Sequence, residues 1–124
     1  MVDTHTHANR SYDTDADYED MIKQASASVL SGICFSDHYE YLPDRNGYVD
    51  FDIEEHIRSL KHFSKKYSFK VLSGIEFGIY EGKMEKIIDA MNTHKFDSVI
   101  VSIHRLKINL LPMLPCLNSI LMLY

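Results

Sequence analysis

Several features that mark large classes of protein are missing from this sequence. Its 124 residues carry a formal charge of -5 and no block of basic residues, which argues against a dedicated nucleic-acid or membrane-surface binder. No apolar run follows a basic stretch at the N-terminus, so no secretory signal is expected. The two cysteines, Cys34 and Cys116, form no CxxC pair, and Cys34 lies in an apolar run that suits a buried thiol. We therefore expect a reducing, cytoplasmic setting.

Apolar residues recur at helical spacing in three stretches of the chain. The spacing of three and four residues predicts one buried face for each helix. Asp17 and Asp52 are suited to cap the first two helices, and Gly32 is suited to end the first. The three stripes are Tyr18, Met21, Ile22, Ala25 and Val29; Ile53, Ile57, Leu60, Phe63 and Tyr67; and Met84, Ile87, Ile88 and Met91.

Strand-like runs alternate with these helices. A short strand is expected at Val2, and others at 33–35, 69–75 and 98–103, with a polar, aromatic loop from about residue 39 to 51. The resulting order, β-α-β-α-β-α-β, predicts an α/β fold with a parallel sheet and helical crossovers. No internal repeat or low-complexity linker interrupts it.

Each expected strand leads into residues that can bind a metal. In parallel α/β folds the loops at the carboxyl ends of the strands converge on one face. Residues far apart in the sequence are therefore expected to meet in one pocket. The residues concerned are Asp3, His5 and His7; Asp37 and His38; Glu76; and His104.

The segment Asp3-x-His5-x-His7 is the sharpest of these signals. In an extended segment alternate residues point the same way, so two imidazoles could grip one cation. Asp3 could act as a ligand or as an outer partner that orients a histidine. The alternative is a pair of surface histidines near a terminus.

Glu76 follows an apolar run, where a carboxylate is costly to desolvate unless it is paired or metal-bound. A carboxylate can bridge two cations, whereas a neutral imidazole has one free lone pair. The alternative is an exposed loop glutamate. His38 and His104 repeat the pattern, although an Asp37-His38 pair is also compatible with a helix cap and a surface ring.

Other polar residues have weaker claims to function. The remaining histidines are expected to be solvated, since they lie in or at the ends of the helices away from the apolar stripes. Arg45 and Arg105 could contact a phosphate, because guanidinium matches phosphate geometry, or be ordinary loop residues. Three tyrosines could wall a substrate pocket or cover the barrel mouth. The histidines are His56, His62 and His94, and the tyrosines are Tyr39, Tyr41 and Tyr48.

Four segments together resemble the PHP superfamily (polymerase and histidinol phosphatase). Order and spacing agree over about the first 105 residues, and Ser11-Tyr12-Asp13 resembles the stretch where histidinol phosphatases carry an aspartate. The segments are Asp3-Thr4-His5-Thr6-His7, Phe35-Ser36-Asp37-His38, Gly74-Ile75-Glu76 and Val101-Ser102-Ile103-His104.

The resemblance implies part of a distorted (β/α)7 barrel, with about four βα units present, and a site for up to three divalent cations (zinc, manganese or iron). It implies hydrolysis of a small phosphate monoester, L-histidinol phosphate, giving L-histidinol in histidine biosynthesis, with Glu76 and His104 as catalytic residues. In the implied site His5 and His7 hold one cation, Glu76 bridges it to a second that His104 also holds, and Asp13 and His38 hold the third.

The chain departs from the family pattern near its end. Family members carry a later histidine and a late Asp-x-His pair, and no histidine follows His104 here. We expect residues 1–107 to be the N-terminal portion of the domain and 108–124 to be a divergent apolar tail, from truncation or a frameshift. The tail, interrupted by two prolines, is not expected to span a membrane. A half barrel leaves an apolar strand edge, so self-association is expected.

Two alternatives stay open beside the histidinol-phosphatase interpretation. Another phosphoesterase of the same superfamily could act on nucleotides, polynucleotides or phosphotyrosine, although no basic stripe favours polynucleotides. The chain could also be an inactive fragment that binds metal. The expected partner is a small phosphorylated substrate, with no nucleic acid and no membrane.

Overall fold

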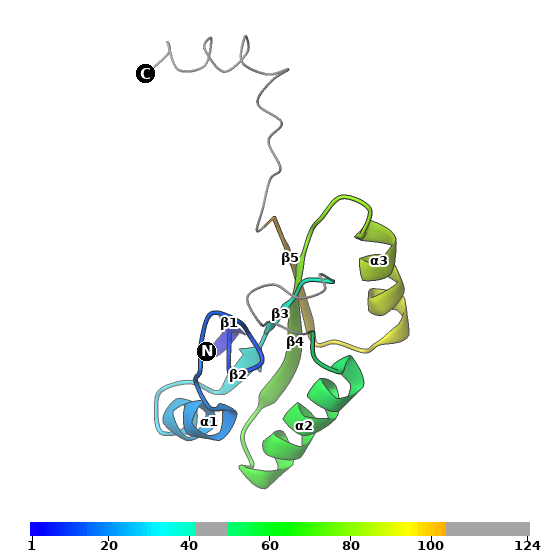
Figure 1. Cartoon of the computed structure of the whole chain (residues 1–124). Coiled ribbons are helices and arrows are strands. Elements are labelled where there is room, and N and C mark those ends of the chain that lie inside the picture. Colours follow the sequence, from blue (N-terminus) through cyan, green and yellow to red (C-terminus); the bar gives the residue numbers. More distant parts are fainter. Residues whose placement is uncertain (42–49, 104–124) are drawn as a thin grey trace, which may run out of the picture.

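The computed structural model describes residues 1–41 and 50–103. Strands and helices alternate along this part of the chain as the sequence predicts (Figure 1). The strands are β1 (Val2–Thr6), β2 (Gly32–Phe35), β3 (His38–Tyr39), β4 (Val71–Gly78) and β5 (Ser98–Ser102); the helices are α1 (Tyr18–Ser26), α2 (Ile53–Lys66) and α3 (Met84–Thr93).

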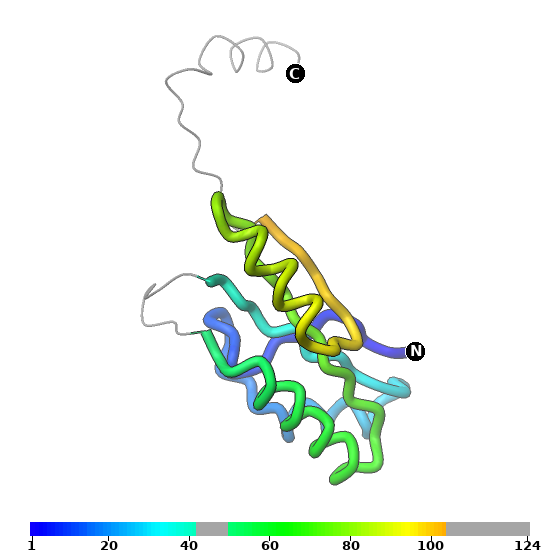
Figure 2. The backbone as a smooth tube through the Cα atoms, turned by 90° about the vertical axis from the view of Figure 1, so that its right-hand side faces the viewer, coloured from blue at the N-terminus to red at the C-terminus, as the bar shows by residue number. Residues whose placement is uncertain are grey.

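All strand pairs in the described sheet are parallel. β2 lies between β1 and β4, and β5 lies on the other side of β4. The two-residue strand β3, which the sequence did not predict, pairs with β4 beyond the end of β2. Because parallel crossovers are right-handed and the strands follow one another across the sheet, the helices lie on one face, as Figure 2 shows for α2 and α3.

Two apolar clusters hold the helices on the sheet. The first packs Tyr18 and Ile22 of α1 against Phe35 of β2, and the second packs Ile87 of α3 against Phe77 of β4. Full burial of each large apolar side chain contributes about 1.5–3 kcal/mol before entropy is counted. The sheet is therefore anchored on its helical side, which leaves the carboxyl ends of the strands to carry polar groups.

The expected helix starts are confirmed, but the end of the first helix is not where the sequence predicted it. Asp17 accepts hydrogen bonds from the first backbone amides of α1, and Asp52 accepts one from Glu55 in α2. Helix α1 ends at Ser26, so Val29 lies beyond the apolar stripe and is 86% exposed. Gly32 begins β2 instead of ending the helix.

The stripe expected for the third helix is only partly buried. Ile87 faces the core, but Met84, Ile88 and Met91 are exposed, because the face toward the sheet runs through Ile87 and Ala90. Val101 of β5 and Ile103 directly after it are exposed as well, and these exposed apolar side chains are here called the apolar surface over α3 and β5. Within the described ranges, β5 pairs with β4 alone, so its other edge is open.

Several sequence predictions lie outside the described residues: most of the polar loop, the expected domain boundary after 107 and the tail. In the described part, no helix has the length and apolar character that crossing a membrane requires. The strand expected at 69–75 is shifted, because β4 continues to Gly78. Glu76 therefore lies within a strand and its side chain has a direction fixed by the sheet.

Candidate metal centre

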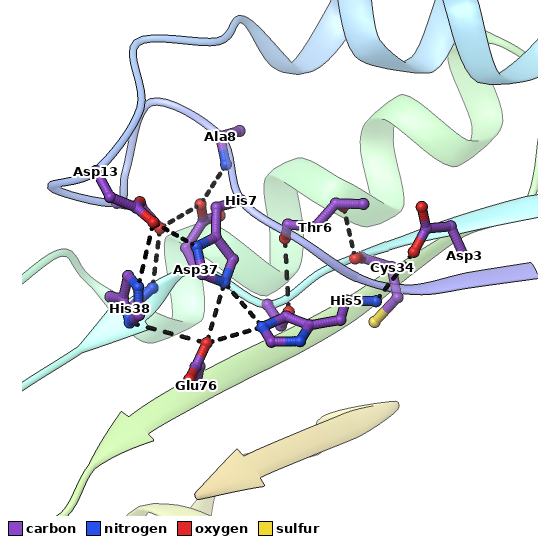
Figure 3. A network of polar contacts seen from close by, with 12 residues as sticks. Asp3, His5, Thr6, His7, Ala8, Asp13, Cys34, Asp37, His38 and Glu76 are labelled. Atoms are coloured by element: carbon purple, nitrogen blue, oxygen red, sulfur yellow. Dashed lines mark hydrogen bonds and ion pairs between the residues drawn. The ribbon is translucent and has the colours of Figure 1, made fainter. Parts of the chain in front are cut away.

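Strand β1 delivers two histidines to the carboxyl end of the sheet. His5 lies in β1 and His7 directly follows it, so both rings point to the same side, toward β4 (Figure 3). Asp3 does not join them: its Oδ1 accepts a hydrogen bond of 3.2 Å from the backbone amide of His5. This contact reaches the backbone of His5 and not its ring, and the outer role expected for Asp3 stays a prediction.

The carboxylate of Glu76 lies between these two rings. Its Oε2 is 2.9 Å from Nε2 of His5 and 3.0 Å from Nε2 of His7, and the two Nε2 atoms are 3.0 Å apart. Glu76 is only 5% exposed, and a buried carboxylate requires a compensating charge. An imidazole in its neutral form supplies a lone pair rather than charge, and the three potential ligand atoms converge on a point where a divalent cation fits.

A second group of ligand atoms adjoins the first and shares His7. Oδ2 of Asp13 is 3.0 Å from Nδ1 of His7 and 3.4 Å from Nε2 of His38. Burial acts to raise the pKa of Asp13, but the hydrogen bond from His7 and the attraction of the His7 and His38 rings in their protonated form outweigh it and leave the pKa below its ordinary value. Asp13 therefore stays an anion near neutral pH.

The two ring nitrogens of His7 can have different roles. A neutral ring has one N–H and one lone pair. If Nδ1 donates to Asp13, Nε2 is free to bind a cation beside His5 and Glu76. Asp13 then orients His7 and, with His38, can hold a further cation. This arrangement, carboxylate to histidine to metal, is common in protein metal sites.

Glu40 is a buried acid beside the site that the sequence analysis missed. Its Oε1 is 3.8 Å from Nδ1 of His38, and its Oε2 accepts a hydrogen bond from the hydroxyl of Tyr80. Gly78 makes room for it, since a Cβ there would overlap the Glu40 carboxylate. Spacing could have revealed it, because His38 and Glu40 are alternate residues of an extended segment.

His56 corrects one expectation. It was expected to be solvated, but it is fully buried beneath the site. Its Nε2 is 3.1 Å from the carbonyl oxygen of Gly74, which can only accept, and its Nδ1 is 3.1 Å from Nη1 of Arg10, which can only donate. The proton therefore sits on Nε2. Desolvation by burial lowers the pKa of His56, which keeps the ring neutral.

The other expected site residues fall into two groups. Tyr39 and Tyr41 pack edge to face at 4.9 Å and contact Phe77 in the second core cluster, which favours a covering role over a pocket wall. His62 is exposed and His94 partly so, in line with solvated rings. The residues outside the described ranges are His104, Arg105, Arg45 and Tyr48.

Comparisons with known proteins found one matching family model and several similar proteins. The model of the PHP domain family matches residues 3–116. A protein named probable histidinol-phosphatase from Thermotoga maritima is 32% identical over 114 residues, 90% of this chain and 43% of that protein. One of the same name from Clostridium acetobutylicum is 33% identical over 106 residues, 86% of this chain and 40% of that protein.

A solved structure shares the fold. It is the crystal structure of histidinol phosphate phosphatase from Lactococcus lactis subsp. lactis Il1403, complexed with zinc, L-histidinol and phosphate. The TM-score is 0.72 at 27% sequence identity, over 86% of this chain and 41% of that one. The present chain thus spans less than half the length of each of these relatives.

Proposed function

The chain belongs to the PHP domain family, and we propose that it carries part of a metal-dependent phosphatase that hydrolyses L-histidinol phosphate to L-histidinol and phosphate. One observation carries the metal dependence: buried Glu76 lies within 3.0 Å of ring nitrogens from both His5 and His7. The names of the three relatives support the substrate.

The donor set fits hard or borderline divalent cations. Imidazoles and carboxylates suit zinc, manganese or iron, and zinc occurs in the Lactococcus structure. Cations bound there would supply Lewis acidity toward a phosphoryl oxygen and would lower the pKa of water. Up to three cations are proposed, with ligands His5, His7, Asp13, His38, Glu76 and His104.

The side chains of this chain have distinct tasks in the proposed reaction. Glu76 holds negative charge at the centre of the site, where it can bridge two cations. Asp13 keeps the N–H of His7 directed away from the ligand point. Among residues beyond the described ranges, we propose His104 as a catalytic ligand and Arg105 as a contact for the substrate phosphate.

The test is phosphate release from L-histidinol phosphate by the metal-loaded chain. We expect release that depends on added zinc or manganese and is lost in Glu76→Ala. Glu54→Ala is the matched control, since Glu54 is an exposed acid on α2. Equal activity in the Glu76→Ala variant would contradict the role of the carboxylate. A panel of nucleotide and phosphotyrosine substrates separates other phosphoesterases of the superfamily.

A second candidate is an inactive metal-binding fragment, because the grouping of His5, His7 and Glu76 supports cation binding with or without hydrolysis. Metal analysis after dialysis distinguishes the two candidates. The fragment binds cations through His5 and His7 but releases no phosphate, and a His5→Ala/His7→Ala variant binds none. A chain that neither binds nor hydrolyses contradicts both.

Three further features belong to this proposal. The substrate is a small phosphorylated molecule, and neither nucleic acid nor a membrane takes part. The chain self-associates through the open edge of β5 and the apolar surface over α3 and β5. The setting is cytoplasmic, where a free thiol such as that of Cys34 stays reduced.

A further inference from the structure

Asp37 is a fully buried acid that belongs to neither group of ligand atoms. Three donors occupy its carboxylate. The backbone amide of Ala8 donates to Oδ1 at 2.6 Å, the hydroxyl of Ser11 donates to Oδ1 at 3.0 Å, and the hydroxyl of Tyr18 donates to Oδ2. Bonds of this kind, from neutral donors to a charged acceptor, are stronger than those between neutral groups.

The donors come from one segment, the connection between β1 and α1. Ala8 directly follows His7, Ser11 lies two residues before Asp13, and Tyr18 opens α1. Asp37 therefore ties down this connection on both sides of Asp13, at points close to two of the candidate ligands. Figure 3 shows the bond from Ala8.

Ser11 links the same carboxylate to a third ligand. Its hydroxyl donates to Asp37 and accepts a hydrogen bond of 3.0 Å from the backbone amide of His38. Ser11 is itself buried, so water does not readily replace these bonds. One hydroxyl thus connects the β1–α1 segment to the start of β3.

We propose that Asp37 is a positioning residue that acts through Ser11 and Ala8 to set the spacing of His7, Asp13 and His38. This proposal rests on the proposed metal site and assigns Asp37 no direct contact with a cation. It explains why an acid at this position is buried: it organises a polar segment instead of binding metal or capping a helix. Outer partners of metal ligands typically alter affinity by about 10- to 100-fold.

The first experiment titrates the full chain with Co²⁺ and follows visible absorption, which reports binding by histidine and carboxylate ligands. We expect Ser11→Ala to lower the affinity for the cation held by Asp13 and His38 by about 10-fold or more. Ser11→Thr, which retains the hydroxyl, should restore most of the affinity. Asp37→Asn retains one acceptor oxygen and should bind cobalt better than Asp37→Ala.

Ser73→Ala is the matched control. Ser73 is also buried, and its hydroxyl donates to a carboxylate, Oδ2 of Asp97, at 2.9 Å. Ser73 precedes Glu76 by three residues in β4, so its side chain lies on the opposite face of the strand, and its loss should lower stability without changing cobalt affinity. If Ser73→Ala weakens cobalt binding as much as Ser11→Ala does, the effect is one of general stability and the proposal is wrong.

A readout without metal separates this proposal from the proposed function. Amide hydrogen exchange of residues 8–13 in the metal-free chain should be faster in Ser11→Ala than in wild type and unchanged in Ser73→Ala. If the wild-type chain binds no cobalt, both the proposed metal site and the positioning role are wrong. If the wild-type chain binds cobalt, and Ser11→Ala binds it with the same affinity and shows the same amide exchange, only the positioning role is wrong.

Discussion

The backbone amide of Glu76 donates a hydrogen bond of 3.0 Å to the carbonyl oxygen of Asp37. In the same register, His38 of β3 stands opposite Glu76 of β4. The central carboxylate and one histidine ligand are thus placed relative to each other by sheet hydrogen bonds, whereas His5 and His7 arrive on a separate strand. The ligand arrangement is therefore largely set by the backbone before any cation binds.

Single histidine substitutions should separate the two groups of ligand atoms. We expect His5→Ala to lower the affinity for the cation beside Glu76, and His38→Ala to lower the affinity for the cation beside Asp13. Each loss should exceed the cost of losing an outer partner, which is about 10- to 100-fold. Isothermal titration with zinc measures both. His62→Ala, at an exposed position of α2, should bind like wild type. Identical losses in His5→Ala and His38→Ala would argue for one undivided site.

The neutral, buried state of His56 predicts a loss of stability in acid. Its pKa is lowered in the folded chain from the ordinary value of 6.5, so below that pH the unfolded chain binds a proton that the folded chain does not. The free energy of unfolding should fall as pH drops from 6.5 toward the lower folded pKa. Urea unfolding of metal-free chain at several pH values tests this.

His56→Gln provides the comparison, because the amide can donate to Gly74 and accept from Arg10 without titrating. We expect a shallower dependence of stability on pH in this variant than in wild type. A matching substitution, His62→Gln, should keep the wild-type slope. The same slope in wild type and His56→Gln would show that His56 does not contribute.

The position of His56 shows how sequence reasoning went wrong on a residue whose signal was present. Ile53, His56, Ile57 and Leu60 have the spacing of one helix face, and all four are buried. The polar residue type suggested that the His56 side chain is solvated, whereas its spacing from the apolar residues indicated that it is in the core. What the sequence could not show is the carbonyl of Gly74 and the guanidinium of Arg10 that satisfy the ring, because both come from distant parts of the chain.

Adding a methyl group at Gly78 should displace Glu40, the buried acid beside His38. A Cβ there would overlap the carboxylate of Glu40, which lies beside His38. We expect Gly78→Ala to destabilise the chain by about 1–3 kcal/mol, as overpacking usually does. Denaturant unfolding measures the change. Gly78→Ala/Glu40→Asp, with a shorter acid, should recover part of it, and no recovery would mean that the strain lies elsewhere.

Cys34 should be chemically inert in the folded chain. Burial raises the pKa of its thiol to about 11, with smaller contributions from the charges of Asp97 and Asp3, so little thiolate forms near neutral pH. In a Cys116→Ser variant, a thiol reagent should react slowly with Cys34 in buffer and fast in denaturant. Rapid reaction in buffer would show that the core around β2 opens readily.

The apolar surface over α3 and β5 should drive self-association of the 124-residue chain. Val101→Lys places a charge on this surface and should shift the chain toward monomer in size-exclusion chromatography with light scattering. Val29→Lys is the matched control, since Val29 is exposed but lies apart from this surface. A soluble wild-type monomer with cooperative thermal unfolding would contradict the prediction.

The sequence predicted the alternation of elements from simple periodicities, and it pointed to most residues of the candidate metal centre through the ends of the strands and, for Asp13, through the family resemblance. His5, His7 and Glu76 were identified from apolar strands that lead into polar residues, and the structure brings them within 3.0 Å of one another. Glu40 and the links from Asp37 were not predicted. The spacing of His38 and Glu40 was a usable signal for Glu40, whereas the links from Asp37 depend on which residues of separate segments meet, and no local pattern carries that information.

The parallel sheet also determines when the site can form. Val2 pairs with Gly32, Ile33 with Val71, and Gly74 with Ser98, so every one of these pairings closes a long stretch of chain. Such closure costs entropy before contacts compensate for it, which slows folding. In the folded sheet, His5 is held near Glu76 through β2, which pairs with β1 on one side and with β4 on the other. The cluster of candidate ligands therefore depends on pairings between distant parts of the chain, and a cation bound there would link the first strand, β1, to the central strand, β4.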